Sequence, residues 1–188
     1  LAEHYTVYAV DLPGAGDSTI VDFVRIDLEK TFVNTVESFI QAKQLRDVAV
    51  IGHSLGGWIG LQMALRGRTR LRKLVLVDSV GFTSFVPFRF RLLASQTFAR
   101  LLAKTAMAPN FKNMRNFLQS VLAHPQSLDD VYVHYFVESL RRSPLVHPFA
   151  LINRLSGFFH LAPELSLLPL LPRLSTPTLI IVGKRDPL

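Results

Sequence analysis

The sequence contains no cysteine and only one tryptophan among its 188 residues. The absence of cysteine excludes a disulfide-stapled scaffold and any metal site built on thiolates, and it is compatible with either redox compartment. Charged residues make up only 19% of the chain, whereas hydrophobic residues make up 49%, which is enough for a sizeable core. We therefore expect one folded domain, or one domain carrying an insertion, and not a disordered chain.

Long uninterrupted hydrophobic runs are also absent. The longest apolar stretch, residues 155–174, is broken by Glu164 and by three prolines, and prolines break a membrane-spanning helix. Residues 1–14 lack the charged and apolar regions of a signal peptide, so we expect the sequence to begin within a domain. No membrane span is predicted.

The net charge is +7, and five of the basic residues lie close together. They are Arg66, Arg68, Arg70, Arg72 and Lys73. Our interpretation is a solvated helix end and loop with cations near a helix C-terminus, while peripheral contact with an anionic lipid surface stays open. No aromatic residues interleave with these cations, so nucleic-acid binding is not expected.

Short strand-like and longer helix-like patterns alternate through the first 80 residues, and one more strand-like pattern lies near the end of the sequence. Strands are predicted at residues 5–10, 47–52, 73–79 and 176–183. Apolar positions spaced by three and four predict a helix over 27–45, and residues 58–66 predict a second helix that ends at Gly67. Strands separated by helices pair in parallel, with both sheet faces covered. The predicted class is therefore α/β, a mainly parallel sheet with crossover helices.

From Gly81 to Leu174 the strand patterns disappear and helical spacing replaces them. One predicted helical face carries Phe111, Met114, Phe117, Leu118, Val121 and Leu122. Ser127 and Asp130 have the spacing of a capping box ahead of the apolar positions Val131, Tyr135 and Phe136. We predict an all-helical insertion over 81–174 in a core formed by 1–80 and 175–188.

A serine between glycines follows the strand predicted at 47–52. The order of strand, Gly52-His53-Ser54-Leu55-Gly56 and helix is the context of a nucleophile elbow. Such a sharp reversal forces the serine into a strained backbone conformation, and side chains at the two glycines would collide where strand and helix cross. The turn exposes the Ser54 hydroxyl and directs the Leu55 amide toward a developing oxyanion. The alternative is a glycine-rich turn whose serine only caps the helix.

These motifs resemble the α/β-hydrolase family over nearly the whole chain. The segment "YAVDLPGAGDS" is similar to the family's loop after its fourth strand, "VIGHSLGGW" to the elbow, "LVLVDS" to the sixth strand and "TPTLIIVGKRDPL" to the seventh strand with its acid turn. The predicted helical insertion lies where the family inserts a cap. The resemblance implies that Ser54 is the nucleophile, Leu55 the first oxyanion-hole amide and Asp186 the triad acid, with Asp78 as a rival acid.

Two further acids lie in the loop that follows the first predicted strand. Asp11 and Asp17 are expected to structure the loop near the site and not to act in catalysis. A serine nucleophile disfavours the haloalkane dehalogenase and epoxide hydrolase branches of the family.

The triad histidine is expected outside this sequence. The resemblance places it after one further strand, but no histidine follows Asp186. The six histidines present are interpreted as elbow, surface or cap residues, and none has metal-ligand spacing: His4, His53, His124, His134, His147 and His160. The second oxyanion-hole amide is also expected outside the chain. We therefore expect these 188 residues alone to be nearly inert.

The expected function is that of a serine hydrolase that cleaves a carboxylic ester or a related acyl bond through an acyl-enzyme on Ser54. The phenylalanine-rich insertion suggests a small, apolar ester substrate, and the alternative is that these phenylalanines only pack the cap against the sheet. The resemblance implies no metal or organic cofactor. Hydrolysis of a carbon–carbon bond beside a carbonyl needs the same triad and stays open. A catalytically silent hydrolase-fold protein that binds a ligand also stays open.

Overall fold

A three-stranded parallel sheet is the centre of the fold. The computed structural model describes residues 1–23, 25–82, 95–105, 108–142, 151–152, 154–155, 160 and 162–184. The strands are β1 (Val48–His53), β2 (Leu71–Val77) and β3 (Thr178–Ile181), in the spatial order β1-β2-β3. Both neighbouring pairs are parallel, so the carboxyl ends of all three strands meet at one edge. The predicted α/β class is confirmed.

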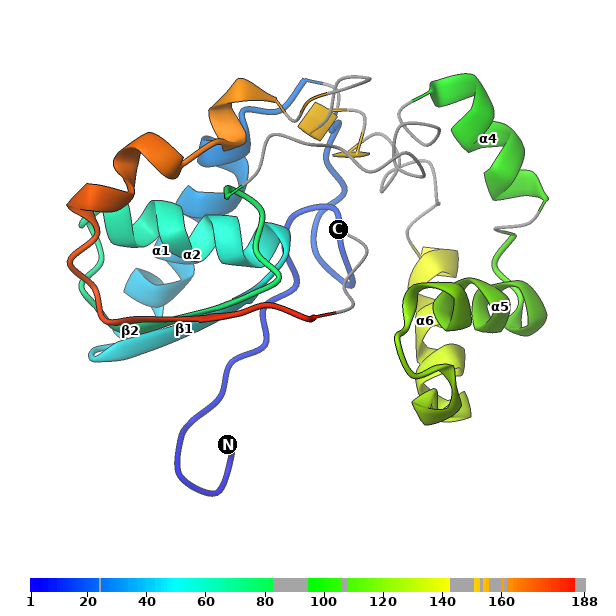
Figure 1. The fold of residues 1–188 in the computed structure, drawn as a ribbon, viewed down its shortest axis with the longest axis horizontal. Helices are drawn as coiled ribbons and strands as arrows, with labels where there is room; N and C mark the ends of the chain where they lie inside the picture. Colours follow the sequence, from blue (N-terminus) through cyan, green and yellow to red (C-terminus); the bar gives the residue numbers. More distant parts are fainter. Residues whose placement is uncertain are drawn as a thin grey trace.

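Two helices precede and follow β1. A π-helical turn, η1 (Glu29–Val33), leads into α1 (Asn34–Ala42), and α2 (Leu55–Arg66) connects β1 to β2. Both helices lie on the same side of the sheet, and α2 packs directly on β1 and β2 (Figure 1). As predicted, α2 ends at Gly67, whose left-handed backbone (φ 65°) lets its N–H donate to the Met63 carbonyl.

The main core lies between α2 and the sheet. Trp58, Leu61 and Met63 of α2 and Leu74 and Leu76 of β2 are almost completely buried. The opposite face of the sheet is not covered by the described residues, since Ile51 and Leu179 are each 57% exposed. The expectation that both sheet faces are covered is therefore not met within the described part of the chain.

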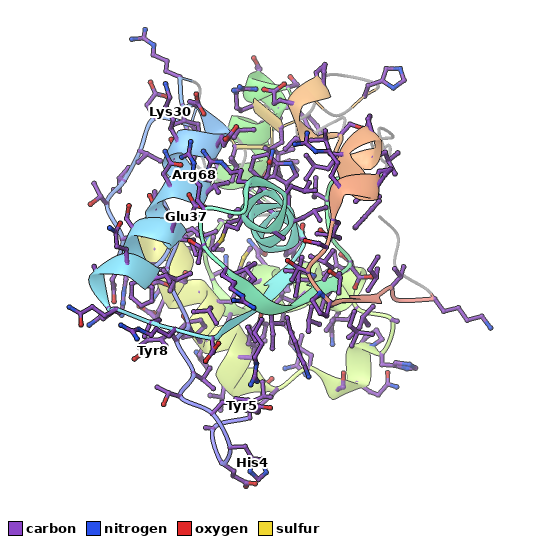
Figure 2. The ribbon with its side chains drawn as sticks, turned by 90° about the vertical axis from the view of Figure 1, so that its left-hand side faces the viewer. His4, Tyr5, Tyr8, Lys30, Glu37 and Arg68 are labelled. Carbon is purple, nitrogen blue, oxygen red and sulfur yellow. The ribbon has the colours of Figure 1, made fainter. Side chains whose placement is uncertain are left out.

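The prediction of a strand over residues 5–10 is wrong. These residues form no strand, and Tyr5, Val7, Tyr8 and Val10 are all exposed. The segment runs along the open side of the sheet, where Figure 2 shows His4 and Tyr5 extending away from the body of the molecule. Its alternating pattern is typical of a strand, but a strand also needs a neighbour to complete its hydrogen bonds, and none of the described strands pairs with it. Tyr8 anchors it by an edge-to-face contact with Phe39 of α1, at 5.6 Å between ring centroids.

All elements described between Gly81 and Leu174 are helical. They are α4 (Gln96–Lys104), α5 (Phe111–Val121), η2 (Pro125–Ser127), α6 (Asp130–Arg142), η3 (Pro163–Leu165) and η4 (Leu168–Arg173). α5 and α6 share a small core of their own, made by Met114, Leu118, Val133, Val137 and Leu140. Leu165 and Leu167 are instead buried in the main core. No helix in the described part of the chain combines the length and the apolar character that crossing a membrane requires.

The predicted details of α5 and α6 need correction. Ser127 does not cap α6, because its hydroxyl donates to the His124 carbonyl within η2. The side chain of Asp129 accepts the Val131 N–H instead.

The buried faces of α5 and α6 also differ from the predicted ones. Val131 and Tyr135 are exposed, and the buried face of α6 carries Val133, Val137 and Leu140. Of the face predicted for α5, Val121 and Leu122 are exposed while Met114 and Leu118 are buried.

Candidate active site

Ser54 occupies the sharp turn between the end of β1 and the start of α2. Its backbone has φ 50° and ψ −117°, a combination that L-residues rarely adopt. The turn is held by its own main chain: the Ser54 N–H donates to the Val77 carbonyl at 3.0 Å, and the Ser54 carbonyl accepts from Gly57 and Val80. A strained residue fixed in this way is typical of a functional turn, because the surrounding hydrogen bonds must oppose a strain of about 1–3 kcal/mol.

The Ser54 hydroxyl has no hydrogen-bond partner among the described residues, and it does not cap α2. The alternative of a serine that only caps the helix is therefore not met in the structure. Ser54 is half-buried. The next residue, Leu55, is the first residue of α2, and no described backbone carbonyl accepts its N–H. The positive end of the helix dipole lies at the same place.

The glycines around Ser54 are crowded in a different pattern from the predicted one. A Cβ at Gly52 would lie 2.3 Å from the Gly56 carbonyl oxygen, so only glycine fits there. A Cβ at Gly56 would meet no described atom within 4 Å, which contradicts the collision predicted for this position. The crowded helix residue is Gly57, where a Cβ would lie 2.4 Å from the Ser79 Oγ. The motif does not include Gly57, so sequence reasoning missed this residue. The signal that could have found it is that two glycines follow each other at positions 56 and 57.

Asp78 follows β2 directly and lies at the same sheet edge as Ser54. Its backbone has φ 41°, and its N–H donates to the Ile181 carbonyl at 2.9 Å. Its carboxylate Oδ1 accepts the Gly183 N–H at 2.7 Å. Both bonds reach toward the end of β3, on the side of β2 away from β1. The rival acid therefore has a partner in the turn that leads to Asp186, and Asp186 itself lies outside the described residues.

The loop of residues 11–18 is organised by Asp11, as predicted, whereas the Asp17 carboxylate makes no bond within the loop. The Asp11 carboxylate accepts the Asp17 N–H at 3.0 Å, and the Asp11 carbonyl accepts the Ser18 hydroxyl at 2.7 Å. Asp17 also forms an ion pair with Arg142 of α6 at 2.9 Å. Both side chains of that pair are largely exposed, so it contributes little to stability.

The described histidines do not gather around Ser54. His53 is exposed at the end of β1, and His134 packs against Phe111, with 4.7 Å between ring centroids. His147 lies outside the described residues. Within the described part of the chain, no three histidine or carboxylate side chains gather in a way that could hold a metal ion.

The sequence matches the model of the alpha/beta hydrolase family over residues 1–188. The chain belongs to this family. A variant of a meta-cleavage product hydrolase has the same fold, with a TM-score of 0.69 and 22% identity, and the alignment covers 100% of this chain and 65% of that protein. At this identity the likeness shows the fold alone.

Two curated relatives carry different assignments. A Mycoplasma pneumoniae protein assigned as an esterase/lipase is 29% identical over 142 residues, which are 74% of this chain and 46% of that protein. An Arabidopsis thaliana 1-acylglycerol-3-phosphate O-acyltransferase is 33% identical over 87 residues, which are 45% of this chain and 21% of that enzyme. The matched regions thus span less than half of either relative. Family membership supports a hydrolase.

Proposed function

We propose that Ser54 is the nucleophile of a serine hydrolase, which cleaves a carboxylic ester or a related acyl bond in the full-length protein. The observation that carries this proposal is the strained backbone of Ser54 combined with a hydroxyl that has no partner among the described residues. A serine that only served the fold would relax or use its hydroxyl as a cap. This one does neither, at the strand-to-helix turn where α/β hydrolases carry their nucleophile.

In the proposed reaction the Ser54 Oγ attacks the ester carbonyl carbon and gives its proton to a histidine base. The tetrahedral oxyanion accepts the Leu55 N–H, which is free of backbone acceptors among the described residues. Collapse breaks the bond to the alcohol, which leaves with the proton from the histidine. Water then attacks the acyl-enzyme and restores the Ser54 hydroxyl. As the family resemblance implies, the base is a histidine that follows the present sequence.

Asp186 is the proposed acid that orients this histidine. Its position after β3 agrees with the family's order of serine before acid. The Asp78 carboxylate is engaged by the Gly183 N–H at 2.7 Å, three residues before Asp186. This bond supports a different role for Asp78, which is to hold the chain at Gly183.

The proposed substrate is a small ester with an apolar acyl group. The esterase/lipase assignment of the Mycoplasma pneumoniae relative supports ester chemistry. The O-acyltransferase relative also acts on an acyl group, as its name states. In the proposal no metal or organic cofactor takes part, because the serine, the oxyanion amide and the histidine account for every bond change.

The test is covalent labelling of the full-length protein by a fluorophosphonate, with Ser54→Ala as the matched control. We expect one adduct on the peptide that contains Ser54, and loss of both adduct and ester turnover by about 10⁴-fold or more in Ser54→Ala. A folded protein that is not labelled would favour a silent binding protein. Labelling without turnover of any ester, together with turnover of a vinylogous diketone, would instead assign carbon–carbon bond hydrolysis.

A further inference from the structure

Acidic residues are absent from a long part of the sequence that includes α4 and α5. Between Asp78 and Asp129 there is no aspartate or glutamate, whereas six lysines and arginines occur there. They are Arg89, Arg91, Arg100, Lys104, Lys112 and Arg115. Seven of the 14 phenylalanines fall in the same stretch. Cations and large apolar side chains without any acid are typical of a segment that lies on an anionic membrane surface.

Within this stretch, α4 (Gln96–Lys104) places apolar side chains on the surface. Phe98 and Leu101 are 36% and 59% exposed, and they share one helical face because they are three positions apart. No described side chain of α4 is buried, and none belongs to either hydrophobic core of the described structure. Figure 1 shows α4 at the outer side of the molecule, away from the sheet. This apolar face is therefore only partly covered by the described residues.

Two exposed lysines near this face have no ion-pair partner among the described residues: Lys104 and Lys112. Lys104 ends α4, three positions after Leu101, and Lys112 is the second residue of α5. The Asn113 side chain donates to the Thr105 carbonyl at 3.0 Å, so the residues that follow the two lysines are in direct contact. The C-terminal end of α4 therefore combines apolar side chains with unpaired positive charge.

Hydrogen bonds from side chains hold both ends of α4. The Ser95 hydroxyl accepts the Phe98 N–H at the N-terminal end, and the Thr105 hydroxyl donates to the Leu101 carbonyl at 2.8 Å at the C-terminal end. The helix is therefore formed before any partner binds. Docking of its exposed face then avoids the entropic cost of folding a disordered segment.

We propose that α4 docks on the surface of an anionic lipid bilayer. Phe98 and Leu101 enter the boundary between headgroups and acyl chains, and Lys104 and Lys112 contact lipid phosphates. A bilayer is favoured over a protein groove because the whole stretch around α4 carries charge of one sign, which matches a surface of uniform negative charge. The contact with lipid is thus assigned to α4 and not to the basic residues at 66–73. It does not depend on the proposed reaction at Ser54.

The test is flotation of the full-length protein with phosphatidylcholine vesicles that contain or lack phosphatidylglycerol. We expect binding only to the vesicles with phosphatidylglycerol, and the same binding for Ser54→Ala, which separates this result from the catalytic proposal. Raising the salt concentration from about 0.1 M to 1 M shortens the screening length from about 10 Å to 3 Å, and should weaken binding by about tenfold or more. Absence of binding, or equal binding to both kinds of vesicle, overturns the proposal.

Matched variants locate the docking surface. Leu101→Ser should weaken binding by about tenfold, because it removes apolar area that enters the bilayer, whereas Val131→Ser on α6, at a position 73% exposed, should change it by less than about twofold. Lys104→Gln should weaken binding by about fivefold. Arg70→Gln removes the same charge from the turn between α2 and β2, and should change binding by less than about twofold. Equal losses in a variant and its control would overturn the assignment to α4, and unchanged melting temperatures verify that the variants are folded.

Discussion

The Asp78 carboxylate accepts the Gly183 N–H at 2.7 Å, which joins the residue after β2 to the turn after β3. The Asp78 N–H adds a second link to the Ile181 carbonyl at 2.9 Å. Two bonds from one residue thus fix the path of the chain just before Asp186. Substitution of the two candidate acids distinguishes an acid that orients the histidine from one that holds the chain after β3.

Replacing Asp186 should affect catalysis much more than replacing Asp78. We expect Asp186→Asn to lower kcat by about 10⁴-fold with little change in thermal stability, because the histidine loses its orienting carboxylate. Asp78→Asn keeps an oxygen that can accept the Gly183 N–H, so its kcat should fall by less than about tenfold. Ester turnover and melting temperature of the two variants check this. The reverse order of effects would identify Asp78 as the triad acid.

The elbow glycines should respond oppositely to alanine. Gly52→Ala places a methyl group 2.3 Å from a backbone oxygen that cannot move aside, and should cost about 3 kcal/mol or more, or prevent folding. Gly56→Ala meets no described atom within 4 Å and improves helix propensity, so stability should rise by up to about 1 kcal/mol. Urea denaturation of both variants measures the difference. Equal destabilisation would show that Gly56 is crowded after all.

Arg66 should be a stabilising residue, unlike the other basic residues that follow it. Its side chain is only 15% exposed and contacts Glu29, Glu37 and Asn34. Arg66→Met should cost about 3 kcal/mol, because it leaves the Glu37 carboxylate, 12% exposed, without its cation. The exposed control Arg72→Met should change stability by no more than about 0.5 kcal/mol. Combining Arg66→Met with Glu37→Leu should recover most of the loss, and failure to recover it would contradict the ion-pair explanation.

Glu164 should make stability depend on acid pH. Hydrogen bonding to its own backbone amide is the main cause that lowers the pKa of the Glu164 carboxyl, and the ion pair with Arg154 at 2.6 Å adds to it. A carboxyl whose pKa is lower in the folded state contributes stability above its unfolded pKa of about 4.3, and this contribution disappears as the pH falls through the folded pKa. Melting temperatures between about pH 6 and 3 should therefore decrease less in Glu164→Gln than in the unchanged protein. Parallel curves for the two proteins would exclude this contribution.

The three strands of the sheet and the end of α2 were predicted correctly from local sequence. The apolar runs that became β1, β2 and β3 and the glycine that ends α2 are read from neighbouring residues. Residues 5–10 have an equally good strand pattern, but a strand also depends on a partner that is distant in sequence. The prediction of Ser127 as a helix cap failed for a different, local reason, because its hydroxyl donates to the His124 carbonyl three residues earlier.

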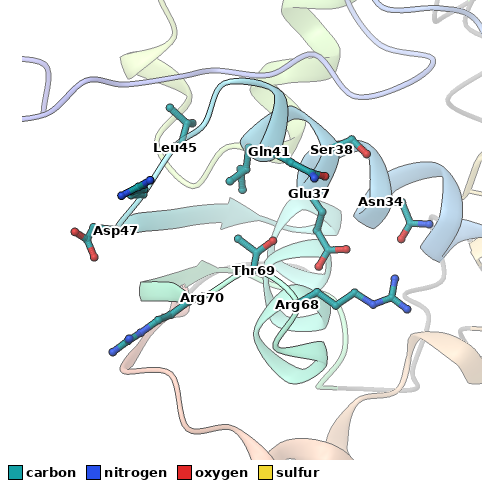
Figure 3. Close-up of a pocket in the computed structure, with 11 residues that line it drawn as sticks. Asn34, Glu37, Ser38, Gln41, Leu45, Asp47, Arg68, Thr69 and Arg70 are labelled. Atoms are coloured by element: carbon teal, nitrogen blue, oxygen red, sulfur yellow. The ribbon is translucent and has the colours of Figure 1, made fainter.

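In the candidate site, too, local features were predicted and long-range contacts were not. The strained turn at Ser54 was predicted because the motif encodes it within five residues. The bond from Asp78 to Gly183 spans 105 positions, and no spacing rule indicates it. The five clustered basic residues look alike in sequence, yet Arg66 is inside an ion-pair network while Arg68 and Arg70 are exposed beside a surface pocket next to α1 (Figure 3). Neighbouring cations acquire different environments only when the turn between α2 and β2 folds.

The backbone of Ser54 also has a consequence for stability. Glycine adopts φ 50° and ψ −117° with less strain than serine. Ser54→Gly should therefore unfold at a higher temperature than the active protein. The expected gain in the free energy of unfolding is about 1 kcal/mol, which already allows for the greater freedom of glycine in the unfolded chain. Thermal melts of Ser54→Gly and Ser54→Ala compare the two, and alanine should give no such gain. Random mutagenesis selected only for heat resistance should therefore discard this serine early. Any thermostabilisation campaign on this protein has to screen for turnover at the same time.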